Sequence, residues 1–300
     1  MQETILNEKA IHSTALFDQA VVILQKKLAT DPHNQQVLWQ LIENTRQQGR
    51  LQEAARYCES LLQLAPEHTQ ARYLHAVLHE TTPVMQSAEM QPVPFIRRED
   101  ILNTKEQQQV WACIAQHQTE FKPSKVVSGN LDARKSQLMD LTDASLLRAI
   151  KSWFLPKVAD VITTQLGYFA MPDLIFGKKE LQLTLHGNQH YFKTHTDVSN
   201  KNYSDKPESE DTAIKSRKIS FVYYLHSIPK MFTGGDLLFD THLAENSYSK
   251  THTRIMPQHN NLILFPSQYY HQVTPVSCAA TDIMQGRFTL NGWFHAKTTD

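Results

Sequence analysis

Six short runs rich in β-branched, aromatic and aliphatic residues constrain the fold of the C-terminal part of the chain. Polar or turn-forming segments separate these runs, which lie at residues 180–185, 218–225, 236–239, 261–265, 272–276 and 287–294. Short strands separated by turn signals are typical of an antiparallel sandwich or barrel. The two longest polar segments, 199–217 and 240–254, are expected to form loops over a binding site, because long loops in a compact β domain are often functional.

The N-terminal part follows a different pattern, in which apolar residues recur at helical spacing. An offset of 34 residues pairs Pro32 with Pro66 and Trp39 with Tyr73, and Gly49 stands at the turn between the two halves. This period, with its early aromatic residue and its terminal proline, resembles the tetratricopeptide repeat, which implies stacked helix pairs that bind peptides or proteins. The alternative is a plain helical hairpin that serves only for packing.

A linker and two further helices are predicted between these patterns. Residues 81–94 contain three prolines and no periodicity, as is typical of a linker. Amphipathic spacing predicts helices at 104–120 and 143–166. We therefore expect an α+β chain, with a small all-α tetratricopeptide-like domain at 1–88 and a second domain at 95–300.

The composition is that of a globular protein. The chain has 300 residues, of which 41% are hydrophobic and 20% charged, and its 30 basic and 30 acidic residues leave no net charge. A neutral balance argues against a general nucleic-acid binder, and the sequence contains neither a run of membrane-span length nor a signal-peptide pattern. Cys58, Cys113 and Cys278 are widely spread without a CxxC pair, which favours a reducing cytoplasm. We expect a cytoplasmic protein with neither nucleic acid nor membrane as a partner.

His195 and Asp197 stand two residues apart in a run with strand character. Side chains at positions i and i+2 of a strand point to the same face, so this imidazole and this carboxylate can bind one metal ion from one side. A second histidine, His271, lies between two apolar runs that are predicted as later strands. Two histidine nitrogens and one carboxylate with open positions opposite are the ligand set of non-haem Fe(II) oxygenases. We therefore predict a catalytic metal centre formed by His195, Asp197 and His271.

Arg287 begins the last predicted strand. Strand alternation places four side chains on one face of this strand, namely Arg287, Thr289, Asn291 and Trp293. A buried arginine requires an anion, its planar fork suits a carboxylate, and Thr289 can add a hydroxyl donor on the same side. An Fe(II) centre with open positions beside such an arginine suggests a carboxylate cosubstrate that also chelates iron, and 2-oxoglutarate has that shape.

Taken together, these motifs resemble the Fe(II)/2-oxoglutarate-dependent oxygenases of the prolyl-hydroxylase-like branch. The resemblance runs from residue 95 to the C-terminus, and its motifs include 187–197, 217–225, 261–267, 271–276 and 286–293. It implies a double-stranded β-helix, or jelly roll, with flanking helices. It also implies that His195, Asp197 and His271 bind iron, that Arg287 binds 2-oxoglutarate, and that O2 is the second cosubstrate. Tyr224 matches a tyrosine that contacts the cosubstrate carboxylate in relatives.

Two positions depart from the family pattern. Many relatives have a glycine six residues before the metal histidine, where this chain has Gln189, and some prolyl hydroxylases have a tyrosine ten residues before it, where this chain has Leu185. The first change alters a turn, and the second requires another group to complete that end of the pocket. His186 is expected to have a structural or substrate-side role, and Arg134 to reach the substrate or to lie on a solvated face.

The reaction predicted from these residues is hydroxylation of a C–H bond, with ascorbate as the reductant in vitro. The resemblance favours a prolyl or other amino-acid residue in a peptide or protein as the substrate. A free or carrier-tethered amino acid is an alternative within the same class. The alternative of another class is a repeat-based adaptor whose oxygenase domain only senses its ligands, with the N-terminal helices binding a protein partner. The complete set of metal ligands and Arg287 favours the enzyme.

Overall fold

The computed structural model describes most of the chain in seven segments. These segments comprise residues 17–81, 92–124, 131–139, 145–198, 214–240, 251–279 and 282–297. By its internal contacts the chain divides into two compact units, one formed by residues 1–92 with 240–254 and the other by residues 93–239 with 255–300. The expected domain boundaries at 1–88 and 95–300 stay a prediction, and the described helices contain no segment long and apolar enough to cross a membrane.

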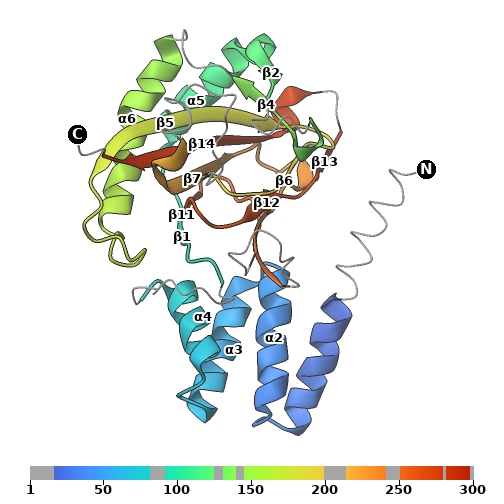
Figure 1. Ribbon diagram of the computed structural model, residues 1–300. Helices are drawn as coiled ribbons and strands as arrows, with labels where there is room; N and C mark the ends of the chain where they lie inside the picture. The colour runs from blue at the N-terminus through green and yellow to red at the C-terminus, as the bar shows by residue number, and fades with distance from the viewer. Residues whose placement is uncertain are drawn as a thin grey trace. The chain divides into compact units, whose positions relative to one another are not determined.

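The described part of the first unit is mainly helical. Its helices run side by side in chain order (Figure 1) and span residues 17–30, α2 (Gln35–Gln47), α3 (Leu51–Leu64) and α4 (Thr69–His79). The side chain of Asn34 caps α2 by accepting from the Val37 N–H, as expected for an N-cap residue. Gly49 has a φ of 76° in the turn between α2 and α3, a left-handed conformation that favours glycine.

The core of this unit explains the apolar spacing in the sequence. One cluster of buried residues comes from three consecutive helices and consists of Leu38, Ile42, Cys58, Leu61, Ala71 and Leu74. Leu38 and Ile42 are four residues apart on α2, so they lie on one face of that helix and pack against α3 and α4. Packing between these amphipathic faces, rather than helix propensity, provides most of the stability of such short helices.

A segment that is distant in sequence belongs to the first unit. Arg46 on α2 is only 1% exposed, and its Nη1 donates to the Thr253 hydroxyl at 2.8 Å. Its Nη2 donates to the Glu43 carboxylate at 2.8 Å. Thr253 lies in β10 (His252–Ile255). The chain therefore leaves the second unit after residue 239 and enters it again at residue 255.

The described strands of the second unit form two larger antiparallel sheets and one pair of strands. The larger sheet has the order β1-β11-β7-β14-β5-β4-β2. Its strands are β1 (Ile96–Arg98), β11 (Leu262–Pro266), β7 (Arg217–Leu225), β14 (Arg287–Ala296), β5 (Phe176–His186), β4 (Gln137–Met139) and β2 (Phe121–Pro123). In the smaller sheet, β9 (Leu237–Asp240), β12 (His271–Val273), β6 (Tyr191–His195) and β3 (Arg134–Lys135) are neighbours in that order.

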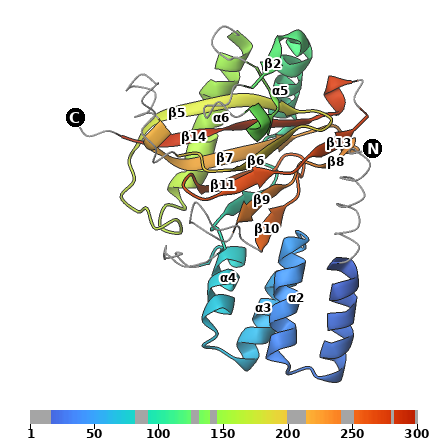
Figure 2. The same ribbon diagram turned by 45° about the vertical axis from the view of Figure 1, so that its right-hand side comes forward.

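Two helices cover one face of the larger sheet (Figure 2), and they are α5 (Thr104–Gln116) and α6 (Ser145–Thr163). Trp111 of α5 packs edge-on against Phe288 of β14, with ring centroids 5.7 Å apart. Phe154 of α6 packs against Tyr223 of β7 at 5.5 Å. Side chains on the opposite face of β14 line a cavity. This arrangement is the expected jelly roll with flanking helices.

Several predicted elements differ from the structure. The segment 240–254, which was expected to be a loop, contains most of β10. The helix predicted at 104–120 ends as α5 at Gln116 and continues as a single 3-10 turn at Gln118–Glu120. The single strand predicted at 272–276 is wrong, because the segment divides into β12 and β13 (Val276–Cys278). Pro275 lacks an N–H group and cannot extend the ladder, and β13 pairs instead with β8 (Phe232–Gly234).

Candidate functional site

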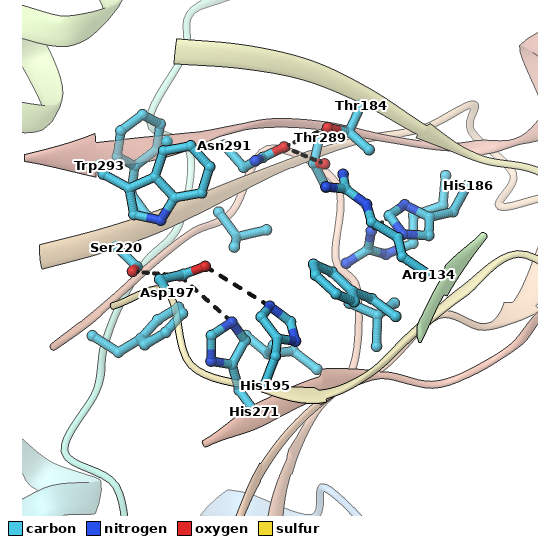
Figure 3. Close-up of a pocket in the computed structure, with 18 residues that line it drawn as sticks. Arg134, Thr184, His186, His195, Asp197, Ser220, His271, Thr289, Asn291 and Trp293 are labelled. Carbon is cyan, nitrogen blue, oxygen red and sulfur yellow. Dashed lines mark hydrogen bonds and ion pairs between the residues drawn. The ribbon is translucent and has the colours of Figure 1, made fainter. Parts of the chain in front are cut away.

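Two adjacent strands of the smaller sheet bring together the residues that were predicted to bind a metal. His195 at the end of β6 pairs in register with His271 at the start of β12, and their ring centroids are 4.2 Å apart. Asp197 follows β6 directly, and its backbone N–H donates to the Ser267 carbonyl at 3.0 Å. Figure 3 shows the Asp197 carboxylate facing both imidazoles, with Oδ1 3.8 Å from His195 Nε2 and Oδ2 3.5 Å from His271 Nε2.

Backbone carbonyls fix the orientation of both imidazoles. His195 Nδ1 lies 2.8 Å from the Lys193 carbonyl, and His271 Nδ1 lies 3.0 Å from the Tyr269 carbonyl. Because a carbonyl oxygen only accepts, each Nδ1 must carry the proton, and each Nε2 lone pair is left for a metal ion. Burial, followed by the nearby His271, lowers the pKa of His195 to about 3, so its ring is neutral and ready to bind a cation at neutral pH.

Asp197 is held in the charged form. Burial opposes ionisation, but His271, His195 and a hydrogen bond from Ser220 outweigh it and keep the pKa of this carboxyl below its usual value. The Ser220 hydroxyl donates to Asp197 Oδ2 at 2.6 Å and lies 2.9 Å from the Ser267 hydroxyl. The donor atoms of Asp197 and the two histidines all lie within 4.8 Å of one another. Two imidazoles and one carboxylate at these separations fit a divalent transition-metal ion.

Arg134 and Phe192 form a second layer beside His195. The Phe192 ring stacks on the His195 ring at 3.5 Å, and the Arg134 guanidinium lies 4.8 Å from the centre of the Phe192 ring. Arg134 Nε donates to the Ser136 hydroxyl at 2.6 Å, and the side chain lines the same cavity as the metal-ready cluster. Burial lowers the pKa of Arg134 to about 10, which still leaves it charged at neutral pH.

Arg287 lies in the wall of the same cavity. Its side chain is 2% exposed, and no carboxylate of the described residues lies within ion-pair distance of it. Arg287 Nη1 is 3.2 Å from Nδ1 of His186, the residue directly opposite in the β5–β14 pair, and Arg287 Nε has no partner in the described chain. Burial and the adjacent Arg287 lower the pKa of His186 well below its usual value, so the ring is neutral and accepts through Nδ1. A buried guanidinium with an unused donor is suited to an anionic ligand.

The two secondary predictions, Thr289 and Tyr224, occupy different positions. Thr289 lines the cavity, and its hydroxyl donates to Asn291 Oδ1 at 3.2 Å, an oxygen that also accepts from Thr184 at 2.8 Å. Tyr224 is absent from the cavity lining, but its ring lies 4.9 Å from the Arg287 guanidinium, and its buried hydroxyl has no hydrogen-bond partner in the described chain. Thr289 therefore follows Arg287 on β14, whereas Tyr224 adjoins Arg287 from the neighbouring strand β7.

Sequence reasoning missed three contacts of this site. Ser220, which orients Asp197, and Phe192, which stacks on His195, lie within the motifs 217–225 and 187–197 but were assigned no role. His186 was assigned only a general structural or substrate-side role, because its contact with Arg287 depends on strand register. Leu185, by contrast, does not line the cavity, and its neighbour His186 does. Most of the polar segment 199–217, which was expected to be a binding loop, lies outside the described residues, as do residues 241–250 of the other such segment.

Comparison with known families agrees with this site. Residues 181–295 match the 2OG-Fe(II) oxygenase superfamily, whose name gives its iron and its 2-oxoglutarate cosubstrate, and residues 16–78 match the tetratricopeptide repeat. A curated relative, an uncharacterized PKHD-type hydroxylase of Synechocystis sp., is 40% identical over 122 residues. This alignment covers 39% of the present chain and 36% of the relative, so the chain matches about a third of that protein's length.

Solved structures similar to this chain include two prolyl hydroxylases. A prolyl-4-hydroxylase of Pseudomonas putida is 16% identical with a TM-score of 0.44, over 69% of this chain and 94% of that one. A prolyl hydroxylase of Trichoplax adhaerens, solved with a hypoxia inducible factor peptide, is 17% identical with a TM-score of 0.47, over 67% and 83%. The chain therefore contains a segment, residues 181–295, that matches the 2OG-Fe(II) oxygenase superfamily, and before it a segment that matches the tetratricopeptide repeat.

Proposed function

We propose that this protein is an Fe(II)/2-oxoglutarate-dependent hydroxylase that inserts oxygen into a C–H bond of a prolyl or other amino-acid residue in a peptide or protein. The observation that carries this proposal is the pairing of two features in one cavity. One is the cluster of His195, Asp197 and His271, in which the two Nε2 atoms lie 3.8 Å and 3.5 Å from oxygens of the carboxylate. The other is Arg287, a buried guanidinium without a carboxylate partner in the described chain. In this proposal residues 95–300 form the oxygenase domain and residues 1–88 the tetratricopeptide-like domain.

Three side chains would hold the iron, and their neighbours would keep them in place. His195 and His271 would bind through Nε2 because their Nδ1 protons are engaged by carbonyls, and Asp197 would bind through a carboxylate oxygen. Ser220 would keep the carboxylate plane fixed through its 2.6 Å hydrogen bond. The bound iron supplies the oxidising chemistry, in which decarboxylation of 2-oxoglutarate to succinate is coupled to hydroxylation of the substrate.

Arg287 would bind the distal carboxylate of 2-oxoglutarate. Its unpartnered Nε and its planar fork can donate two parallel hydrogen bonds to a carboxylate. The hydroxyl of Tyr224, whose ring lies 4.9 Å from the Arg287 guanidinium on the adjacent strand, would add a third donor. Thr289 would have to turn its hydroxyl away from Asn291 before it could donate to the cosubstrate. We therefore rank Tyr224 ahead of Thr289 as a cosubstrate contact.

Two observations bear on the choice of substrate. The relative from Synechocystis is named as a hydroxylase of the PKHD type, and the tetratricopeptide-like helices offer a surface that could bind a polypeptide substrate or a protein partner. A free or carrier-tethered amino acid is the second candidate, because the same cavity would accept it without help from the helices. All three cysteines are free, which is consistent with a reducing cytoplasm as the place of action.

Succinate release and product mass test the reaction. The full-length protein, given Fe(II), ascorbate, O2 and 2-oxoglutarate, should release succinate and add the mass of one oxygen atom to peptides of a proteolysed lysate. His195→Ala should abolish both signals and iron binding, while His33→Ala, an exposed histidine of the first unit, should change neither. Arg287→Gln should retain iron but raise the KM for 2-oxoglutarate by about 100-fold, as expected when a charge-assisted pair is lost.

The outcomes separate the candidate functions. Turnover of free amino acids without a peptide product would favour the second candidate substrate. Iron and 2-oxoglutarate binding without turnover of any peptide or amino-acid pool would favour a sensing adaptor over an enzyme. Unchanged iron binding in His195→Ala, together with the absence of succinate, would refute the proposed function.

A further inference from the structure

A second group of potential metal ligands lies in the helical unit. His75 and His79 are four residues apart on α4, which puts both imidazoles on the same face of the helix. Their ring centroids are 4.3 Å apart. Glu59 extends from α3 toward them, and its Oε1 lies 3.3 Å from His79 Nε2. One donor atom from each of the three residues lies within 4.8 Å of the others.

The packing of α3 against α4 fixes this arrangement. Glu59 directly follows Cys58, and His75 directly follows Leu74, and both of these preceding residues are buried in the shared core of the helical unit. The three ligand side chains therefore extend from the border of a rigid helix–helix contact rather than from loops. Such placement on packed helices is what a metal site requires, because the donors are held close together before the ion arrives.

The donor set indicates which ions would bind. Bonds of about 2 Å in a tetrahedral site place neighbouring donor atoms about 3.4 Å apart, and the His79–Glu59 separation of 3.3 Å already satisfies this spacing. The Glu59 side chain is 48% exposed and that of His79 35% exposed, so both side chains have room to rotate. Small rotations can therefore bring their donor atoms to the same spacing from the third donor, His75. Two imidazoles with one carboxylate suit Zn²⁺ and similar transition metals, whereas Mg²⁺ and Ca²⁺ prefer oxygen ligands alone.

The presence of a second imidazole also points to a shared cation. A simple ion pair between His79 and Glu59 would account for only two of the three residues. The second imidazole, stacked on the first at a 40° tilt, is explained if both rings share one ligand.

We propose that Glu59, His75 and His79 bind a Zn²⁺-class transition-metal ion that joins α3 to α4. The site is built from residues other than those of the oxygenase cavity and does not rest on the proposed function. Its fourth coordination position is left to solvent, because two of the three ligands are partly exposed. An ion that binds both helices only when they are packed stabilises that packing. The stability of the contact between α3 and α4 would therefore depend on metal.

Titration of the full-length protein with ZnCl2 alone tests this proposal. By calorimetry in millimolar Mg²⁺, the wild-type protein should bind two equivalents, one in the oxygenase cavity and one at Glu59, His75 and His79. His75→Ala and Glu59→Gln should each weaken one equivalent by at least about tenfold, the size of effect known from changes to metal sites. The exposed control His33→Ala should leave both equivalents intact. Circular dichroism should show unchanged helix content in all variants, because the altered side chains lie at the surface.

The melting temperature gives a second readout. Zn²⁺ should raise it by several degrees in His195→Ala, which keeps only the helical site, and the rise should vanish in His195→Ala/His75→Ala. A single equivalent that disappears in His195→Ala would overturn the proposal. So would a second equivalent that persists in His75→Ala, in His79→Ala and in Glu59→Gln. A single equivalent that is lost in His75→Ala but kept in His195→Ala would support the helical site while counting against iron binding in the cavity.

Discussion

Gly235 offers a sharp test of how Arg287 is positioned. Its φ is +68°, and a Cβ atom at this position would lie 2.6 Å from Arg287 Cδ and 3.0 Å from Val276 Cγ2. Carbon atoms in contact are normally about 3.5–4.0 Å apart, so in Gly235→Ala the arginine side chain or the turn must move by about 1 Å. The left-handed backbone adds about 1–2 kcal/mol of strain, and overpacking adds about 1–3 kcal/mol. We therefore expect the free energy of unfolding to fall by about 2–5 kcal/mol.

The same displacement should weaken the binding of 2-oxoglutarate. Misplacing Arg287 by about 1 Å removes at least one of the two charge-assisted hydrogen bonds that its fork can make, and one such bond contributes about 1.5–3 kcal/mol. The Kd for 2-oxoglutarate in Gly235→Ala should then rise about 10- to 100-fold, while the affinity for Mn²⁺ in place of iron should stay the same because Arg287 is not a metal ligand. Calorimetric titration of the folded variant measures both quantities.

A matched control is available in the same unit. Gly167 is exposed, its φ is outside the left-handed region, and a Cβ atom there would have no neighbour within 4 Å. Gly167→Ala should therefore leave stability and 2-oxoglutarate affinity unchanged. If Gly235→Ala folds and binds 2-oxoglutarate as tightly as the wild-type protein, Arg287 does not hold the cosubstrate in the way proposed.

Three further predictions concern other positions. Ser220→Ala removes the hydroxyl that donates to Asp197. It should lower the affinity for Mn²⁺ about tenfold, which is the lower end of the effect of residues that orient metal ligands. An unchanged Mn²⁺ titration would show that the carboxylate does not need this hydrogen bond. Gln189 has a φ of +58°, so Gln189→Gly should leave the free energy of unfolding in urea unchanged or raise it by up to about 1 kcal/mol, and a clear loss would contradict the idea of backbone strain. Burial, Arg254 and Arg46 lower the pKa of His252 from 6.5 to about 4. The unfolded chain therefore binds a proton first as the pH falls, and stability should decrease from pH 6.5 to pH 4 by up to about 3 kcal/mol. That slope should be flatter in His252→Gln, and equal slopes would disprove the assignment.

The metal-ready cluster was predictable because its chemistry is local. His195 and Asp197 share a face of one strand, and this follows from the period of a strand without any knowledge of the fold. The same reasoning placed Arg287, Thr289 and Asn291 on one side of β14, and all three line the cavity. Side-chain identity and alternation were sufficient for these residues.

The remaining contacts depend on which strands are neighbours. His186 meets Arg287 only because β5 and β14 pair in a register that places these two residues opposite each other, and Ser220 reaches Asp197 from a strand of the other sheet. Spacing along the sequence contains no information of this kind. The divided strand at Pro275 is different, since a proline inside a predicted strand is a local signal that argued for a break.

The return of residues 240–254 to the helical unit has a consequence for how this protein can be dissected. The chain passes from one unit to the other at three places, after residues 92, 239 and 254. Neither unit is therefore a single continuous segment of the sequence. A cut near residue 88 would remove Arg46 and leave Thr253 without the guanidinium that binds its hydroxyl. If such a truncation lost activity, the cause could be the loss of packing partners for residues 240–254 as readily as the loss of a substrate-binding surface. Point substitutions on the exposed faces of α2, α3 and α4, in an otherwise complete chain, test the helical unit without that ambiguity.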